Sequence, residues 1–249
     1  MRIATWNLDH ASNGSRPIGL QIQQVCAIQP DVIVLTETCE EVGLAQHGYE
    51  VALPSQKNEY GKYWTAIWSK YPIIEQLPTY DPSTAICAAI DTPLGQIMVY
   101  GTIIPYRDYK GIKGDSPAWH EHYQAISDHG DDWNSLFQRT MGKFPLFVAG
   151  DFNQTRDNSS RTYGTRLGRD MLSEELERNN MTCLTTENFG DTGKLKVDPV
   201  KGWARNSIDH ICMTMTAFSV VNVGAWDHFT ESGEYMSDHN GVYVDVTLP

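Results

Sequence analysis

The sequence of 249 residues lacks the features that mark membrane, repeat and multidomain proteins. No stretch approaches the roughly 18 uninterrupted apolar residues of a transmembrane helix, so we expect no membrane span and no membrane partner. No Gly-, Ser- or Pro-rich tract divides the chain, and no internal repeat is present. We therefore expect one domain over residues 1–249, which is long enough to bury a core without disulfides or structural metals.

Cysteine is scarce and irregularly spaced. The five residues, Cys26, Cys39, Cys87, Cys183 and Cys212, are odd in number and form no C-x-x-C pair. This pattern disfavours a zinc site and a disulfide framework. Most of them lie in apolar runs, which predicts small buried side chains and a reducing, cytoplasmic compartment.

Basic residues are outnumbered, with 19 Lys and Arg against 31 Asp and Glu, for a formal net charge of −12. A field of this sign repels phosphate backbones and disfavours proteins that coat nucleic acid without sequence preference. Carboxylates that bind divalent cations add to the same negative count, and a bound ion reverses the sign locally. The charge therefore weighs against a DNA-coating protein more than against a metal-dependent nuclease.

Short apolar runs recur along the chain and predict many strands. A turn at Pro93, Leu94 and Gly95 joins two of these runs into a hairpin. The predicted strands cover residues 2–8, 31–35, 49–53, 64–68, 85–90, 96–104, 145–149, 181–185, 207–213, 218–223 and 241–248.

Helical spacing of apolar residues predicts three helices, over residues 18–28, 116–140 and 165–179, with Thr165 as the N-cap of the last. Within the second, residues 128–132 predict a break, and Ser-Asp-His at 127–129 predicts a surface turn. Many strands and few helices in one domain require two packed sheets with helices outside them.

Polar side chains recur where the predicted buried strands begin or end. Taken singly, Asp and Asn at such positions are common turn formers. That explanation weakens because every one of these positions offers a carboxylate or carboxamide, and one adds a histidine. The residues are Asn7, Asp9, Glu37, Asp151, Asn153, Asp209, Asp238 and His239.

Together these side chains have the chemistry of metal-assisted hydrolysis of a phosphate ester. Glu37, Asp9, Asp151 and Asp238 offer hard oxygen ligands, which suit Mg²⁺ or Mn²⁺ rather than soft metals. A histidine with a carboxylate partner is an oriented acid or base. The two asparagines can donate to a phosphoryl oxygen or orient water.

Asp-His occurs five times, at 9–10, 128–129, 209–210, 227–228 and 238–239. Because side chains alternate along a strand, His210 points to the face opposite Asp209 and is expected to be structural.

The ordered motifs Trp-Asn-Leu-Asp (6–9), Thr-Glu-Thr (36–38), Gly-Asp-Phe-Asn (150–153), Ser-Ile-Asp-His-Ile (207–211) and Ser-Asp-His (237–239) resemble those of the endonuclease/exonuclease/phosphatase superfamily, the DNase I-like fold. The resemblance covers nearly the whole chain, from residue 2 to 248. It implies an α/β fold, a four-layer α/β/β/α sandwich of two mostly antiparallel sheets with outer helices, with the site at one end of the sheets.

The resemblance also implies roles for the strand-end residues. Glu37 becomes the metal carboxylate, supported by Asn7, and Asp9 and Asp238 lie near a second metal position. Asp151 positions or deprotonates the attacking water, and Asn153 orients water or phosphate. His239 contacts the phosphate and is hydrogen-bonded to Asp209. Either Asp151 or His239 can be the base, and coupled groups can share that role.

One departure from the family pattern concerns the segment at 101–106. Many relatives place His or Tyr there to hold the phosphate or protonate the leaving group, whereas the aligned residue here is Ile103, which can do neither. Tyr106 and Arg107 in the following loop are the candidates to replace it.

A basic cluster follows Gly-Asp-Phe-Asn directly. It contains Arg156, Arg161, Arg166 and Arg169, with Tyr163 among them. One interpretation is a solvated loop and helix start. The other is a substrate-binding loop in which arginine holds phosphate and tyrosine stacks on a base or ring.

The sequence thus predicts a monomeric, divalent-metal-dependent phosphoesterase, and favours a phosphodiesterase or nuclease whose phosphate-ester substrate is DNA, RNA or a nucleotide-like ester. The alternative is a phosphatase for a small phosphorylated molecule or lipid headgroup. A non-catalytic binding module on the same fold is less favoured, because the metal carboxylates are all retained.

Overall fold

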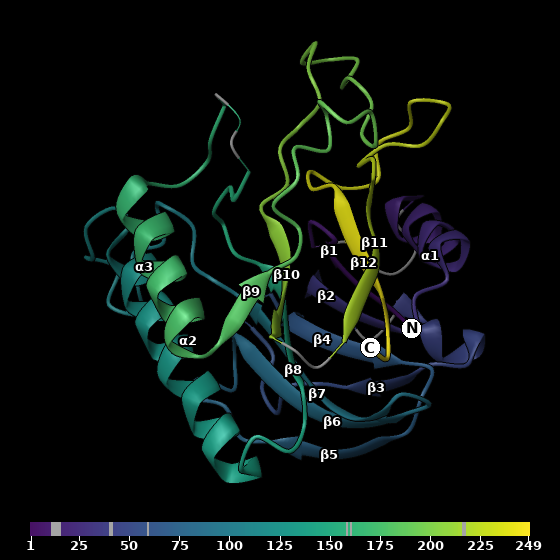
Figure 1. Cartoon of the computed structure of the whole chain (residues 1–249). Helices are drawn as coiled ribbons and strands as arrows, with labels where there is room; N and C mark the ends of the chain where they lie inside the picture. Colours follow the sequence, from purple (N-terminus) through teal and green to yellow (C-terminus); the bar gives the residue numbers. More distant parts are fainter. Residues whose placement is uncertain (11–15, 40–41, 59, 158, 160, 216–217) are drawn as a thin grey trace.

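The computed structural model describes residues 1–10, 16–39, 42–58, 60–157, 159, 161–215 and 218–249. Its core consists of two six-stranded sheets stacked face to face (Figure 1). The first has the order β11-β12-β1-β2-β4-β3 and the second β5-β6-β7-β8-β10-β9. Each contains one parallel pair, β1 with β2 and β7 with β8, among antiparallel neighbours.

The strands are β1 (Arg2–Asn7), β2 (Val32–Thr38), β3 (Glu50–Ala52), β4 (Tyr63–Ser69), β5 (Ile73–Leu77), β6 (Ala85–Thr92), β7 (Gly95–Ile103), β8 (Leu146–Asp151), β9 (Met181–Cys183), β10 (Asp209–Thr214), β11 (Ser219–Trp226) and β12 (Gly241–Thr247). The helices are α1 (Arg16–Ile28), α2 (His120–Thr140) and α3 (Arg166–Arg178), with a short 3₁₀ helix at Leu44–His47.

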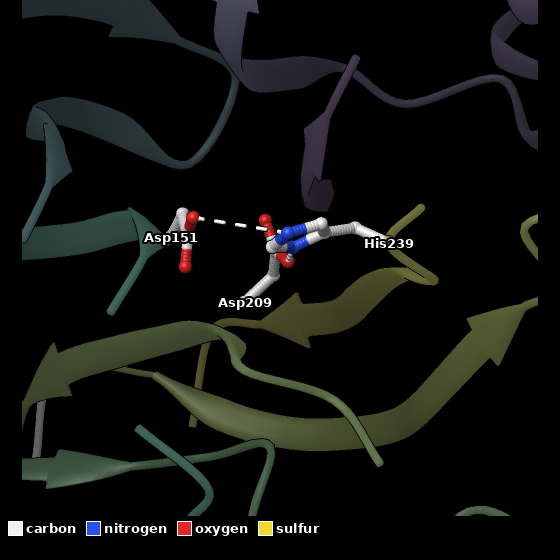
Figure 2. A group of neighbouring side chains, drawn as sticks. All are labelled: Asp151, Asp209 and His239. Carbon is white, nitrogen blue, oxygen red and sulfur yellow. Dashed lines mark hydrogen bonds and ion pairs between the residues drawn. The ribbon is translucent and has the colours of Figure 1, made fainter. Parts of the chain in front are cut away.

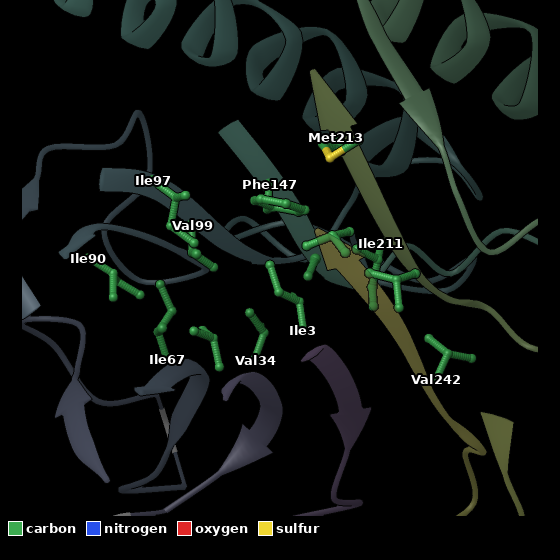
Figure 3. Packing of buried hydrophobic residues seen from close by; sticks show 14 of the residues in the cluster. Ile3, Val34, Ile67, Ile90, Ile97, Val99, Phe147, Ile211, Met213 and Val242 are labelled. Atoms are coloured by element: carbon green, nitrogen blue, oxygen red, sulfur yellow. The ribbon is translucent and has the colours of Figure 1, made fainter. Parts of the chain in front are cut away.

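Alternation along the strands divides the apolar residues into layers. Ile3 and Val34 face the second sheet, in the cluster that Figure 3 shows between the sheets. Their neighbours Ala4 and Leu35 face the other way, in the cluster that includes Ile18 and Val25 of α1. A third cluster joins the second sheet to α2 and α3. The order of layers is therefore α, β, β, α, as predicted, and strands buried on both faces explain the continuous apolar runs.

The helix predicted over 116–140 differs from the observed one. α2 runs without interruption through residues 128–132, and Ser-Asp-His at 127–129 lies inside it rather than in a surface turn. His129 is fully buried, 2.9 Å from the Tyr100 hydroxyl and 2.7 Å from the Thr102 hydroxyl, and it stacks on Trp133. These tertiary contacts keep the polar segment helical. Among the described residues, no helix is both long and apolar enough to cross a membrane.

One strand, one helix cap and one turn differ in how well the sequence predicted them. The strand β5 was missed because its side chains are mostly exposed and form no apolar run. The predicted cap of α3 is confirmed, since the Thr165 hydroxyl accepts a hydrogen bond from the Gly168 amide at 3.0 Å. The turn before Gly95 also joins β6 to β7 as predicted.

Candidate active site

The polar strand ends meet at one end of the stacked sheets. Asn7 closes β1, and Glu37 lies near the end of the parallel strand β2. In the other sheet, Asp151 closes β8 and pairs in register with Asp209, the first residue of β10. His239 lies just before β12, the antiparallel neighbour of β1. Figure 2 shows the side chains of Asp151, Asp209 and His239 converging from these separate segments.

Four residues of the site have left-handed backbone conformations. The φ angles are 51° at Asp9, 52° at His10, 48° at Glu37 and 46° at Asn153. Such angles are uncommon outside glycine and cost on the order of 1–3 kcal/mol each, least for Asp and Asn. Their concentration where strands end is typical of a functional site, where the surrounding structure holds strained residues in place.

Gly150 has to be glycine. Its φ is 145°, and a Cβ atom at this position would lie 1.8 Å from the carbonyl oxygen of Thr102 on the neighbouring strand. No side chain fits there, so the close approach of β7 and β8 depends on this glycine. The residue that follows is Asp151, whose position is thereby tied to the sheet.

His239 and Asp209 form a short, buried pair. Nδ1 of His239 lies 2.6 Å from Oδ2 of Asp209, which is fully buried. Burial opposes the charged imidazole, but the charges of Asp209 and Asp151 outweigh it and raise the pKa of His239 to about 10. The backbone of His239 is fixed as well, because its amide donates to the Ser237 hydroxyl and its carbonyl accepts from Trp6. The imidazole is therefore oriented and cationic at neutral pH.

Asp151 faces the other ring nitrogen of this imidazole. Its Oδ2 atom lies 4.0 Å from Nε2 of His239 and accepts hydrogen bonds from the side-chain amides of Asn7 and Asn153, both at 3.1 Å. Burial raises the pKa of Asp151 to about 7, and the nearby charge of Asp209 acts in the same direction. Asp151 can therefore accept or release a proton near neutral pH, which suits a general acid or base.

Glu37 is held from both sides. Asn7 donates to one carboxylate oxygen at 3.1 Å, and Nε2 of His10 lies 2.9 Å from the other. Burial alone would raise the pKa of Glu37, but the hydrogen bonds from His10 and Asn7 reverse this effect and lower it. Glu37 is therefore ionised at neutral pH.

Asp9 and Asp238 extend this group of carboxylates. The Tyr235 hydroxyl donates to Asp9 at 3.1 Å, and Asp238 is exposed, 3.7 Å from Nε2 of His239. Burial raises the pKa of Asp9, and the charges of Asp238 and Glu37 raise it further. This mutual repulsion indicates that the three carboxylates share one negative region.

These residues fit a hard divalent cation. Glu37, Asp9 and Asp238 offer carboxylate oxygens, and sulfur ligands are absent from the set, which suits Mg²⁺ or Mn²⁺. A second grouping also exists, because ligand atoms of Asp151, Asp209 and His239 lie within 4.8 Å of one another. In that grouping Nδ1 of His239 is hydrogen-bonded to Asp209, and Nε2 is the nitrogen that faces Asp151. This arrangement suits an acid–base cluster, and it also leaves Nε2 as the atom that could bind an ion.

The segment that departs from the family pattern lies where the sequence predicted. Ile103 ends β7 and pairs in register with Asp151. Tyr106 and Arg107 follow in a loop, and both are exposed. Arg107 lies 3.8 Å from Asp108.

The arginines after Gly-Asp-Phe-Asn have different partners. Arg156 donates to the carbonyl of Arg169 and to the Ser173 hydroxyl, so it fastens this loop to α3. Arg161 lies over the ring of Trp203 at 4.2 Å.

The other two predicted members of that segment differ in where they lie. Arg166 is 90% exposed and lies 3.6 Å from Asp170. Tyr163 is partly exposed and contacts Trp119 edge to face, at 5.7 Å between ring centroids. Burial raises the pKa of Tyr163, the backbone of Arg107 hydrogen-bonds to it, and the charge of Asp151 acts on it, so Tyr163 lies beside the candidate site.

Sequence reasoning missed two residues of the site. His10 contacts Glu37, and Tyr235 contacts Asp9. For His10 the signal was its position next to the first motif, although four other Asp-His pairs offered the same signal. His210 is structural as predicted: it is buried, close to Thr185 and to the Gln154 carbonyl.

A model of the endonuclease/exonuclease/phosphatase family matches residues 4–239 of the chain. A comparison with curated protein sequences gave no match.

Solved structures share the fold at low identity. The 3'-5' exonuclease NExo from Neisseria meningitidis is 20% identical, with a TM-score of 0.70 and 99% of both chains covered. Neisseria NExo, described as a 3' phosphatase and bound to a product DNA hairpin, is 19% identical, with a TM-score of 0.69 and 99% of both chains covered. An AP endonuclease from Archaeoglobus fulgidus is 17% identical, with a TM-score of 0.67 and all of both chains covered.

Proposed function

Because the chain belongs to the endonuclease/exonuclease/phosphatase family, we propose that it is a divalent-metal-dependent phosphodiesterase acting on nucleic acid or on a nucleotide-like ester. Members of this family hydrolyse phosphoester bonds. The observation that carries the proposal is the His239–Asp209 pair, which faces Asp151 at the same strand ends that bear Glu37.

Glu37 is the residue that would hold a Mg²⁺ or Mn²⁺ ion, with Asp9, Asp238 and Asn7 beside it. An ion bound there supplies positive charge that polarises a phosphoryl oxygen and stabilises charge in the transition state. The chemistry of these oxygen donors supports the assignment. It also explains how a chain of net charge −12 accepts an anionic substrate.

Proton transfer falls to Asp151 and His239, which act as a coupled pair. Asp151 orients or deprotonates the attacking water, while Asn7 and Asn153 hold its carboxylate in place. The His239 imidazolium, positioned by Asp209, places positive charge where the phosphate gains negative charge. Ile103 beside Asp151 cannot donate a proton, so assistance to the leaving group has to come from another residue or from water.

The alternative is a phosphatase for a small phosphorylated molecule or lipid headgroup. It gains support from Arg156, Arg161 and Arg166, whose side chains contact α3, Trp203 and Asp170 within the chain itself. Neisseria NExo bears descriptions of both kinds, as an exonuclease and as a 3' phosphatase. A binding module without catalysis is disfavoured because the dyad and the carboxylates are all retained. The single-domain organisation, monomeric state and cytoplasmic location stay predictions.

A substrate panel tests the proposal. Oligonucleotides, nucleotide diesters, nucleoside monophosphates and sugar phosphates are assayed with Mg²⁺, Mn²⁺ or EDTA, and His239→Ala serves as the inactive control. We expect metal-dependent cleavage of diesters that His239→Ala abolishes. Release of phosphate from monoesters alone would favour the alternative, and no hydrolysis of any ester would favour the binding module.

A further inference from the structure

A small cavity of about 150 Å³ opens beside Glu37. Pockets for drug-sized ligands measure about 300–1,000 Å³, so this one holds a single ring system. None of the roles assigned above uses it. Its lining includes Glu37 and His10, and around them Tyr60, Trp64, Ile103, Tyr106 and Tyr109.

Two separate segments supply the aromatic rings. Tyr60 precedes β4 and Trp64 lies near its start, with ring centroids 6.3 Å apart and planes at 84°. Tyr106 and Tyr109 follow β7, with centroids 6.4 Å apart. Tyr60 is 62% exposed and Tyr106 is 49% exposed. Exposed aromatic side chains around a concavity are typical of a ligand site, because their faces can stack on a flat partner.

Ile103 connects this aromatic pocket to the reaction centre. It pairs in register with Asp151, and its buried side chain lines the cavity. Glu37 borders the cavity as well. A ring seated in the pocket is therefore adjacent both to the proposed metal carboxylate and to the strand that carries the proposed base. Ile103, where the chain departs from the family pattern, gives the pocket an apolar wall. A polar side chain at this position would bind water and make the pocket less suited to an aromatic ring.

The charge of the pocket selects the kind of ring. Glu37 is the acidic residue among its described lining, and it is the residue proposed to hold the metal ion, whose charge would offset that of the carboxylate. Aromatic cages bind a quaternary ammonium through ring faces, and a carboxylate whose charge is not offset strengthens that binding. With the charge of Glu37 offset by an ion, and with His10 2.9 Å from its carboxylate, the pocket fits a neutral, flat heterocycle better than a cation.

We infer that the aromatic pocket binds the nucleobase attached to the reacting phosphate, an inference that rests on the proposed function. The base stacks on the tyrosine and tryptophan rings while its phosphate lies toward Glu37 and Asp151. Stacking of one base on aromatic side chains changes affinity by about 5- to 150-fold. The pocket thus selects nucleotide esters over esters that carry no base.

The test compares AMP with ribose 5-phosphate, which differs by the base alone, and adds phosphocholine as the cationic competitor. Dissociation constants are measured by NMR titration of the full chain, with EDTA to prevent turnover and again with Mg²⁺. We expect AMP to bind about 5- to 150-fold more tightly than ribose 5-phosphate. Tyr60→Ala and Tyr106→Ala should shrink this ratio toward one. Phe137→Ala, an exposed aromatic residue on α2 outside the pocket, should leave it unchanged.

Two results would overturn the inference. One is equal binding of AMP and ribose 5-phosphate, or a ratio that the two tyrosine variants do not alter. The other is tighter binding of phosphocholine than of AMP, which would make the pocket a quaternary ammonium site. The EDTA measurement requires no hydrolysis, so it gives an answer even if the substrate panel finds no phosphoesterase activity. The two proposals can therefore fail separately.

Discussion

Asp209 holds the imidazole of His239 at 2.6 Å and is itself the cross-strand partner of Asp151. Because β8 and β10 are hydrogen-bonded neighbours, the two aspartates cannot shift independently. One position of the sheet register therefore fixes both the carboxylate that orients the imidazole and the carboxylate that faces its other nitrogen. The geometry of the acid–base group is a consequence of strand pairing.

Asp209→Asn should reduce turnover by about 10²- to 10⁴-fold, the usual contribution of an oriented acid or base. The Asp209 charge helps to raise the pKa of His239 to about 10, so its removal should lower that pKa. NMR titration of His239 in EDTA, in both proteins, measures the shift without metal. An identical titration curve in the two proteins would disprove the pairing, whatever happens to turnover.

Glu37→Gln should weaken Mg²⁺ binding and abolish hydrolysis at ordinary Mg²⁺ concentrations, because a neutral amide is a poorer ligand for a hard cation. Isothermal titration with Mg²⁺ measures this binding independently of activity. Glu174→Gln, an exposed position on α3, is the matched control and should behave as the parent protein.

EDTA should remove all activity, and Mg²⁺ or Mn²⁺ should restore it. Full activity after exhaustive chelation would rule out the metal mechanism.

The architecture was largely predictable because strands buried on both faces appear in the sequence as continuous apolar runs, which can be recognised without any periodicity. Residues 31–35 are an example: their apolar run includes the first half of β2. The prediction of secondary structure failed where local sequence carries no apolar pattern or where tertiary contacts determine the conformation. β5 has a mostly exposed surface and no apolar run. His129 is drawn into the core by Tyr100 and Thr102, which lie 29 and 27 residues away, so local polarity at 128–132 suggested a break that does not exist.

The site residues were predictable for a different reason: polar side chains recur where the apolar runs begin or end, and their order along the chain matches the motifs of the family. The contacts around them were not. Tyr235 reaches Asp9 across 226 residues of sequence, and no local pattern encodes that distance. The aromatic pocket likewise combines rings from two segments that meet only in the folded chain: residues 60–64, at the start of β4, and residues 106–109, after β7.

Asp198 should make stability depend on pH. It is buried, 3.0 Å from Arg205 and 3.0 Å from His228. Burial favours the neutral acid, but hydrogen bonds from the backbone and Arg205 outweigh it and hold the pKa of Asp198 well below its usual value. Since the folded pKa is depressed, the stabilisation is fully present above the unfolded pKa of about 4 and is lost as the pH falls through the folded value.

Urea unfolding across this pH range measures the effect. Asp198→Asn should cost about 1–3 kcal/mol at neutral pH, because Arg205 and two backbone amides lose a charged hydrogen-bond acceptor, and the difference from the parent should shrink in acid. Asp170→Asn, which removes an exposed ion pair with Arg166, should cost at most about 1 kcal/mol. Equal costs for the two variants, or a difference that does not vary with pH, would contradict the assignment.

The arginines after Gly-Asp-Phe-Asn should separate into two kinds. Arg156 is bonded to α3, so Arg156→Ala should lower stability by about 1–3 kcal/mol and leave KM near that of the parent. Arg161 contacts the Trp203 ring, and Arg166 forms an exposed ion pair with Asp170. If these two arginines hold phosphates outside the reacting one, their replacement by Ala should raise KM with little change in kcat. The rise should be larger for oligonucleotides than for a small diester, and the salt dependence of binding should become flatter, since fewer counterions are released. Equal small effects on long and short substrates, with the same salt slope, would identify the segment as a solvated loop and move the small-molecule phosphatase ahead of the nuclease.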